Sequence, residues 1–98
     1  MKLEIRISGR ARRDIADILE YIQKRNPAGA DRLYERVGRA INLLSEFPGI
    51  GQPTVKSGVR MTTVPRYGYK IYYSASDDNL DIIHIRHPAR RDPKREDL

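Results

Sequence analysis

The first half of the chain predicts one short strand followed by two amphipathic helices. Residues 3–7 alternate apolar and charged side chains, which is the period of a strand with one buried face. Ser8 is suited to cap a helix over about residues 9–25. Asn26-Pro27 then marks the start of a second helix that runs to about Glu46. The apolar positions that recur at helical spacing in the two helices are Ile15, Ile18, Leu19, Ile22, Ala30, Leu33, Val37, Ile41 and Leu44.

The second half of the chain predicts three strands, over residues 59–64, 69–75 and 80–86. Their short connections indicate antiparallel neighbours. The element order is therefore β-α-α-β-β-β, and the fold class is α+β, with a helical hairpin packed on one face of a small antiparallel sheet. We expect one domain over residues 1–98, in which the basic tail 88–98 is extended or frayed because it has no apolar period.

Alternation along the three later strands separates two faces of the sheet. Matching the apolar residues predicts that Met61, Ile71, Ile83 and Ile85 lie under the helices. The uncovered face then carries a cationic set with one aromatic ring and one imidazole: Arg60, Lys70, Tyr72, His84 and Arg86. Such a face can hold phosphate or carboxylate groups. A solvated sheet face without any function has the same composition, so both interpretations stay open.

The composition adds a strong positive charge to this picture. Lys and Arg number 19 against 13 Asp and Glu, for a net charge of +6, and each half of the chain carries +3. The charge therefore belongs to the folded surface, and it indicates a polyanionic partner such as nucleic acid, a nucleoprotein or an acidic protein. No apolar run is long enough to span a bilayer. The absence of Cys fits a reducing cytoplasm, where we expect the protein to act.

Several short segments, taken in order, resemble a known family. They are Ala11-Arg12-Arg13-Asp14-Ile15-Ala16-Asp17-Ile18, Phe47-Pro48-Gly49-Ile50-Gly51, Gly58-Val59-Arg60, Tyr69-Lys70-Ile71-Tyr72-Tyr73 and Ile83-His84-Ile85-Arg86-His87-Pro88-Ala89-Arg90. In order and spacing they resemble the RelE/ParE superfamily of bacterial toxins, and the ParE-like branch more than the RelE-like branch. The resemblance covers roughly residues 3 to 92.

The resemblance implies the toxin of a type II toxin–antitoxin pair, a plasmid- or chromosome-borne stabilisation module. Its partner would be a ParD-like or RelB-like antitoxin with a carboxy-terminal segment that folds on the toxin. ParE-like members are associated with inhibition of DNA gyrase and growth arrest, whereas RelE-like members cleave mRNA on the ribosome. The gyrase interpretation describes a binding protein and the ribonuclease interpretation an enzyme. Both branches share the fold, so the fold does not distinguish between them. Neither reading requires a cofactor, a metal or a membrane.

The residues that would carry these activities differ between the two branches. A ribonuclease needs a base, an acid and cations for the phosphorane, and the candidates here are Arg60, Lys70, His84, Arg86 and His87. A gyrase-directed toxin would use target-binding candidates from the same face and the chain end: Arg60, Tyr72, His84, Arg86, His87 and Arg90. His87 has a simpler alternative, which is to cap the strand end through a backbone hydrogen bond. The ParE-like ending favours the gyrase interpretation.

Antitoxin binding is expected at the helical hairpin. An acidic, amphipathic segment would place apolar residues in a groove and carboxylates against a basic rim. The candidate residues are Arg32, Leu33, Tyr34, Arg36, Val37 and Arg39. A stand-alone nucleic-acid-binding module is a third interpretation, but no recognition-helix or RNP-type pattern supports it. Two His without Cys give no metal-ligand cluster.

Overall fold

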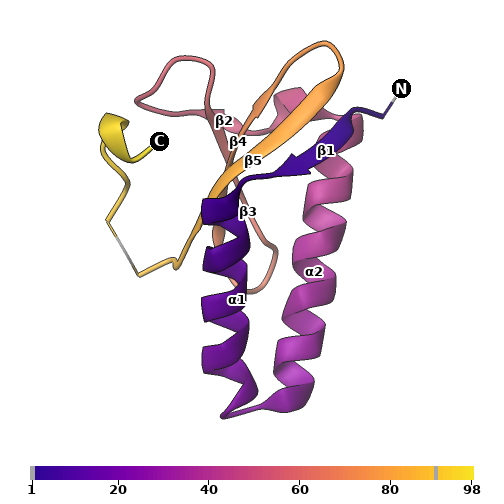
Figure 1. Cartoon of the computed structure of the whole chain (residues 1–98), viewed down its shortest axis with the longest axis vertical. Coiled ribbons are helices and arrows are strands. Elements are labelled where there is room, and N and C mark those ends of the chain that lie inside the picture. Colours follow the sequence, from indigo (N-terminus) through magenta and orange to yellow (C-terminus); the bar gives the residue numbers. More distant parts are fainter. Residues whose placement is uncertain (1, 90) are drawn as a thin grey trace.

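A computed structural model describes residues 2–89 and 91–98, so Arg90, one of the target-binding candidates, lies outside the described residues. Two long helices form an antiparallel hairpin that extends from one end of a twisted sheet (Figure 1). The elements are β1 (Glu4–Ile7), α1 (Gly9–Gln23), α2 (Pro27–Glu46), η1 (Pro48–Ile50), β2 (Gln52–Pro53), β3 (Arg60–Thr63), β4 (Lys70–Ala75), β5 (Asn79–Arg86) and η2 (Arg95–Asp97). The predicted α+β class and β-α-α-β-β-β order are confirmed, with β2 as a short addition.

The sheet is mixed rather than antiparallel. Its strand order is β1-β5-β4-β3-β2, and β1 pairs parallel with β5 while the other pairs are antiparallel. The prediction of an antiparallel sheet was wrong at β1, because no short turn links β1 to its neighbour and local signals therefore do not set its direction. In this register Ile5 lies opposite Leu80 and Ile7 opposite Ile82, so β1 adds its apolar side chains to the same core.

Both helices begin where the capping residues predict. Ser8 caps α1 by accepting a hydrogen bond from the Ala11 amide at 3.0 Å. Asn26 caps α2 in the same way through the Gly29 amide at 3.0 Å, with Pro27 in the first turn. Each cap satisfies an amide that the helix leaves without a partner. Neither helix in the described chain is long and apolar enough to cross a membrane.

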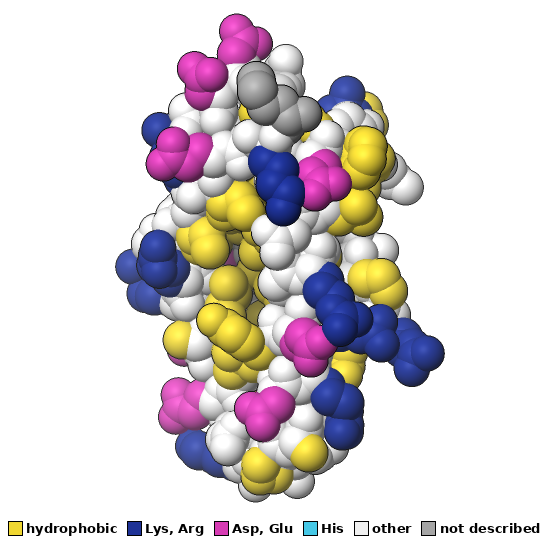
Figure 2. Space-filling view, turned by 90° about the vertical axis from the view of Figure 1, so that its right-hand side faces the viewer, with side chains coloured by type: hydrophobic (Ala, Val, Ile, Leu, Met, Phe, Trp, Pro, Cys, Tyr) yellow, Lys and Arg dark blue, Asp and Glu magenta, His cyan; other side chains and the backbone are white. Residues whose placement is uncertain are grey.

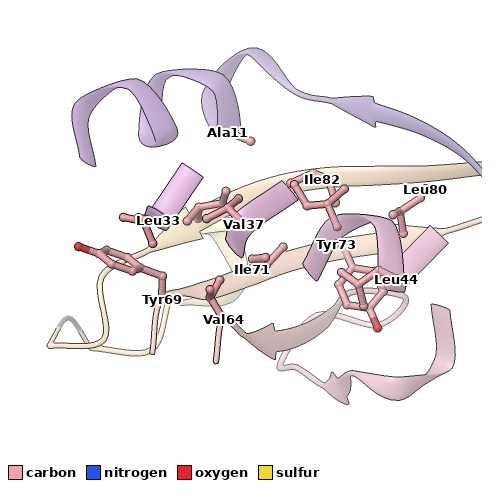
Figure 3. Packing of buried hydrophobic residues seen from close by; sticks show 12 residues of the cluster. Ala11, Leu33, Val37, Leu44, Val64, Tyr69, Ile71, Tyr73, Leu80 and Ile82 are labelled. Carbon is pink, nitrogen blue, oxygen red and sulfur yellow. The ribbon is translucent and has the colours of Figure 1, made fainter. Parts of the chain in front are cut away.

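The core lies between the helical hairpin and the sheet (Figure 3). The helices contribute a stripe of aliphatic residues, and the sheet contributes aliphatic side chains and two tyrosines. The Tyr73 ring is fully buried, and its hydroxyl donates to the Pro48 carbonyl oxygen at 2.7 Å and accepts from the Gly51 amide at 2.9 Å. That pair of hydrogen bonds ties the loop after α2 to the centre of the sheet. The buried residues of this cluster are Ala11, Leu33, Val37, Ile41, Leu44, Val64, Tyr69, Ile71, Tyr73, Leu80, Ile82 and Ile85.

A β-bulge changes which residues of β5 face the core. Tyr72 pairs with His84, but the next residue, Tyr73, pairs with Ile82, so Ile83 is left as an extra residue in β5. Ile82 is therefore fully buried beside Tyr73, whereas Ile83 is only half-buried. The prediction that Ile83 lies under the helices was wrong, because simple alternation fails across an inserted residue.

Met61 also lies on the other side of the sheet from the one predicted. The register of β3 against β4 places Met61 opposite Tyr72 and Arg60 opposite Tyr73. Residues directly opposite each other share a face, so Met61 belongs to the face turned away from the core and Arg60 to the helix side. The prediction followed the hydrophobicity of Met61, but the strand register decides the face.

Candidate functional site

The face of the sheet turned away from the helices gathers four of the five predicted polar residues. Lys70 lies opposite Arg86, and Tyr72 lies opposite His84, on neighbouring strands β4 and β5. The Tyr72 and His84 rings stack with centroids 5.8 Å apart and an interplanar angle of 22°. The structure therefore brings together Lys70, Tyr72, His84 and Arg86, as alternation along the strands predicts.

Arg60 does not join this cluster. Its side chain lies on the helix side of the sheet, where Nη1 donates to the Gly51 carbonyl oxygen at 2.8 Å. The expectation that Arg60 shares a face with Lys70 and Arg86 was wrong for the same reason as the placement of Met61. Arg60 instead supports the loop that follows η1.

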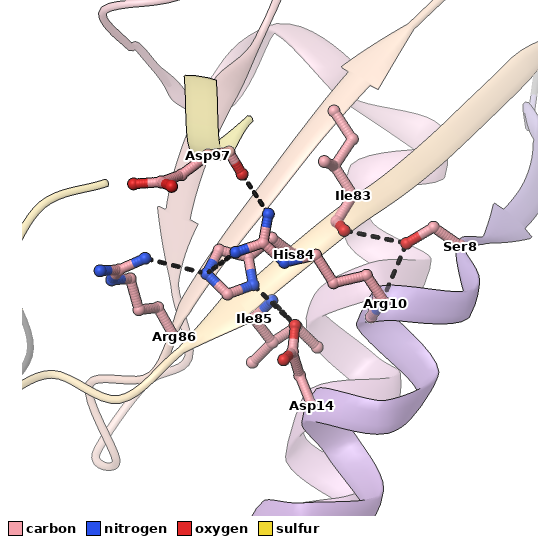
Figure 4. Close-up of polar contacts among 9 residues, drawn as sticks. Ser8, Arg10, Asp14, Ile83, His84, Ile85, Arg86 and Asp97 are labelled. Carbon is pink, nitrogen blue, oxygen red and sulfur yellow. Dashed lines mark hydrogen bonds and ion pairs between the residues drawn. The ribbon is translucent and has the colours of Figure 1, made fainter. Parts of the chain in front are cut away.

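His84 is buried, and its imidazole is fixed by a residue that the sequence analysis did not single out. The Nδ1 atom of His84 lies 2.6 Å from Oδ2 of Asp14 in α1, and only 4% of His84 is exposed (Figure 4). The same carboxylate oxygen accepts the Ile85 amide at 3.1 Å. Asp14 lies within the helix segment quoted for the family resemblance, but only the packing of α1 against β5 reveals its partner.

The contact exists because α1 takes the place of a strand along the edge of β5. The strand β1 ends opposite Ile82, and the chain then turns into α1. The Ser8 hydroxyl donates to the Ile83 carbonyl oxygen at 2.9 Å, while Asp14 accepts the Ile85 amide. The side chains of the N-cap and of the second turn of α1 thus satisfy backbone groups that an edge strand would otherwise leave open.

Two arginines approach the other nitrogen of the same ring. Arg86 Nη1 lies 3.2 Å and Arg10 Nη2 lies 3.4 Å from His84 Nε2, and Figure 4 shows them reaching this atom from opposite directions. Since a guanidinium only donates, Nε2 must be the acceptor, and the ring is neutral with its proton on Nδ1 toward Asp14. Burial lowers the pKa of His84, and the charges of Arg10 and Arg86 lower it further, against an opposite effect of Asp14.

Residues 91–98, which we call the strap, cross this face instead of extending freely into solvent. Asp92 Oδ1 accepts from Lys70 Nζ at 2.8 Å, and Arg10 donates to the backbone oxygen of Asp97. Farther along, Lys56 Nζ donates to the Leu98 carbonyl oxygen at 2.7 Å. Pro93 is buried, and the strap ends in the short helix η2. The face that was expected to be uncovered is therefore partly covered by the chain itself.

His87 lies at the end of this region, beyond β5. Its Nδ1 accepts the Ala89 amide at 3.0 Å, and its ring packs edge-on against Tyr69 with centroids 5.3 Å apart. This is the backbone hydrogen bond of the simpler alternative. Tyr69 and His87 also line a hollow of about 400 Å³ between α1 and β5, together with Asp14, Asp17, Ile18, Tyr21, His84, Ile85 and Arg86.

The residues proposed for antitoxin binding divide into surface and core. Leu33 and Val37 are 1% and 8% exposed and belong to the core. They were expected to contact the antitoxin, but their side chains are not accessible to a partner in this structure. Tyr34 is 64% exposed, Arg32 and Arg39 are exposed, and Arg36 is half-buried. Arg39 forms an ion pair with Glu35 one helical turn away. Figure 2 views the side on which α2 lies in Figure 1, and there hydrophobic side chains gather between acidic and basic ones.

Within residues 2–89 and 91–98, no three His, Asp or Glu side chains gather into a group that could hold a metal ion. The described site contains cations, hydroxyl and amide donors and the Asp14–His84 pair. Such a set binds anions by charge-assisted hydrogen bonds.

Comparison with known proteins shows which family the chain belongs to. Residues 5–92 match the model of the ParE toxin of the type II toxin-antitoxin system parDE. The chain is 32% identical over 90 residues to the putative toxin Y4kP of Sinorhizobium fredii, covering 92% of this chain and 93% of that protein. It is 33% identical over 81 residues to toxin RelE2 of Caulobacter vibrioides, covering 83% of this chain and 90% of that protein.

The fold also matches a solved structure described as the chromosomal ParDE TA system from P. aeruginosa. The match has a TM-score of 0.77 at 18% identity and covers 88% of this chain and 96% of that one. At this identity the likeness concerns the fold alone. The family model spans nearly the whole described domain, from the second residue of β1 through both long helices to beyond the end of β5. The chain therefore belongs to the ParE toxin family of type II toxin–antitoxin systems.

Proposed function

We propose that this toxin inhibits DNA gyrase as a binding protein, acts in the cytoplasm and is neutralised by a ParD-like antitoxin. The match to the ParE family over residues 5–92 supports the proposal, and the state of His84 is the observation that carries it. His84 is buried, with Nδ1 held by Asp14 and Nε2 by Arg10 and Arg86. A general base must reach the proton that it removes, and this imidazole offers no free nitrogen for that purpose.

The remaining groups of the face are also suited to binding. The described part of the face offers Lys70, Arg86 and Arg10 as cations. Tyr72 on the same face is almost completely buried, and this burial raises the pKa of its hydroxyl. His87 uses Nδ1 for the backbone. Cations on rigid strands favour a docking surface for an acidic or nucleoprotein target, for which charge complementarity raises the association rate and selects the partner.

The gyrase proposal is tested by a supercoiling assay with purified toxin. We expect the wild type to block supercoiling and Arg86→Gln to lose most of this effect, because Arg86 lies on the proposed docking face. Arg39→Gln is the matched control, since it removes an Arg from the outer side of α2, where Arg39 pairs with Glu35. Unchanged supercoiling at saturating wild-type toxin would refute the proposal.

Antitoxin binding is expected at the exposed part of the hairpin, around Arg32, Tyr34, Arg36 and Arg39. An acidic amphipathic segment would pack against Tyr34 and place carboxylates near the arginines, because a disordered segment that folds on binding follows an amphipathic helix face well. Co-expression with the product of the adjacent short reading frame, followed by size-exclusion chromatography, tests for the complex. Separate elution of the two proteins at micromolar concentration would contradict this part.

A RelE-like, ribosome-dependent mRNA endoribonuclease, paired with a RelB-like antitoxin, is the second candidate. The Asp14–His84 pair favours it, because a carboxylate that orients an imidazole is a recurring arrangement in acid–base catalysis. For this function Arg10 and Arg86 would have to move off Nε2 when mRNA enters. Cleavage of mRNA in a translating extract that is abolished by His84→Ala would establish this candidate, and absence of cleavage by the wild type would exclude it.

A further inference from the structure

The strap covers more cationic side chains than its carboxylates neutralise. Lys70 donates to the Asp92 carboxylate of the strap. From the strap, Arg10 has only the backbone oxygen of Asp97 as an acceptor. Arg86 donates to the neutral His84 ring, and its buried Nε atom has no hydrogen-bond partner among the described residues. A buried donor without an acceptor is unfavourable unless a ligand supplies one.

The arginines are held close together although their charges repel. Both reach Nε2 of one imidazole, which can accept them only because the ring is kept neutral with its proton on Nδ1 toward Asp14. Gathering two guanidinium groups at one point costs electrostatic energy unless an anion joins them. The Asp14–His84 pair therefore prepares a convergent set of donors from α1 and β5, and Lys70 on β4 adds a third cation beside it.

The side chains of the strap carry no net charge. Arg91, Lys94 and Arg95 balance Asp92, Glu96 and Asp97. It therefore does not mask the cations by lowering the charge of the protein. It covers them by its position, through the Asp92–Lys70 ion pair. The second contact is the one between Arg10 and the backbone oxygen of Asp97 (Figure 4).

We propose that Arg10, Lys70 and Arg86 form a binding site for the phosphodiester backbone of DNA, which the strap occludes in the free protein. A phosphate group presents several acceptor oxygens and matches the planar donor pair of a guanidinium, so it can satisfy Arg86 Nε and both arginine forks together. The single carboxylate that the strap provides, Asp92, reaches only Lys70. The two arginines then donate to a backbone oxygen and to the imidazole instead. The site shares these three residues with the proposed gyrase-docking face, but its test measures DNA binding without gyrase, so the two proposals can fail separately.

The test removes the ion pair between the strap and Lys70 by Asp92→Asn in the 98-residue chain. The matched control is Glu96→Gln, which makes the same change in net charge. Glu96 is an exposed strap residue whose carboxylate has no ion pair among the described residues. Binding to a short fluorescent DNA duplex is measured by anisotropy over a salt series. Because Lys70 becomes free to contact a phosphate, we expect Asp92→Asn to bind up to about fivefold more tightly than Glu96→Gln at low salt. We also expect the slope of log K against log salt to steepen by about 0.9.

A second pair of variants locates the site. In the Asp92→Asn background, Arg86→Gln should remove the gain in affinity and in slope, whereas Arg39→Gln on α2 should retain most of the gain. Circular dichroism confirms that each variant is folded. Equal DNA affinity of Asp92→Asn and Glu96→Gln would overturn the proposal. It would also be overturned if a glutamate-rich peptide, rather than DNA, gained affinity for Asp92→Asn, because the face would then be a peptide site.

Discussion

Asp14 and His84 are 70 positions apart in the sequence, yet a hydrogen bond of 2.6 Å joins their side chains at the edge of β5. The same Asp14 oxygen accepts the Ile85 amide, so one carboxylate fixes both the backbone and the imidazole. His84 in turn positions Arg10 and Arg86. The cationic face is thus organised by a residue of α1, which is not part of the sheet.

Replacing Asp14 should therefore loosen the site and destabilise the fold. Asp14→Asn leaves an amide that cannot accept both hydrogen bonds equally well, and we expect a loss of about 1–3 kcal/mol in the free energy of unfolding, measured by urea denaturation. Asp17→Asn, one helical turn later and exposed, is the control and should change stability by less than about 0.5 kcal/mol. Equal stability of the two variants would show that the Asp14 contacts contribute nothing.

The buried imidazole predicts a pH dependence of stability. Burial lowers the pKa of His84 in the folded state, whereas the unfolded chain titrates near the ordinary value of about 6.5. Below that pH the unfolded state binds a proton that the folded state does not, so stability should fall as the pH drops below about 6.5 until the folded-state pKa is reached. Urea midpoints across this range should show the fall.

The pH dependence should be lost when His84 is replaced. His84→Gln should flatten the profile between about pH 6.5 and the acid limb, because it removes the group whose folded-state pKa is lowered. Direct titration of the imidazole signals by NMR gives the independent check. A His84 pKa above that of an exposed histidine would contradict the argument.

The bulge in β5 predicts unequal costs for two adjacent isoleucines. Ile82 is fully buried beside Tyr73, so Ile82→Ala should cost about 2–5 kcal/mol in the free energy of unfolding. Ile83 is the extra residue of the bulge and only half-buried, so Ile83→Ala should lower the free energy of unfolding clearly less than Ile82→Ala. Denaturation of both variants measures the difference. The opposite order would mean that β5 keeps simple alternation and has no bulge.

Tyr73 and Gly51 should be sensitive to small changes. Tyr73→Phe removes the hydroxyl that joins Pro48 and Gly51 and should cost about 1–2 kcal/mol, because the buried Gly51 amide loses its acceptor. Gly51→Ala should also destabilise, since a Cβ there would clash with the Tyr73 hydroxyl and lie 2.9 Å from the Met61 carbonyl oxygen. Gly49→Ala, with open space around it, is the matched control in thermal unfolding.

Two neighbouring residues of α2 should separate folding from antitoxin binding. Leu33→Ala opens a cavity in the core and should cost about 2–5 kcal/mol of stability. Tyr34→Ala, at a side chain that is 64% exposed, should leave stability nearly unchanged and weaken the antitoxin complex. Calorimetric titration with the antitoxin measures the second effect. Full affinity in Tyr34→Ala would remove the hairpin surface from the proposed interface.

Local patterns in the sequence determined the helices and strands to within a few residues, because caps and hydrophobic periods act over one or two turns. Ser8 and Asn26 start the two helices, and alternation placed Lys70, Tyr72, His84 and Arg86 on one face. The segments that resemble the family identified it for the same reason, since they are short motifs in a fixed order.

Only the tertiary structure decided how these elements meet. The parallel pairing of β1 with β5, the bulge at Ile83 and the register that turns Arg60 toward the helix side all depend on contacts between distant segments. Leu33 and Val37 are apolar helix positions whose burial, rather than exposure to a partner, follows from packing on the sheet. The Asp14–His84 pair and the strap over Lys70 are long-range contacts as well. A one-dimensional period cannot encode them, because it fixes the side of an element on which a residue lies but not what that side will face.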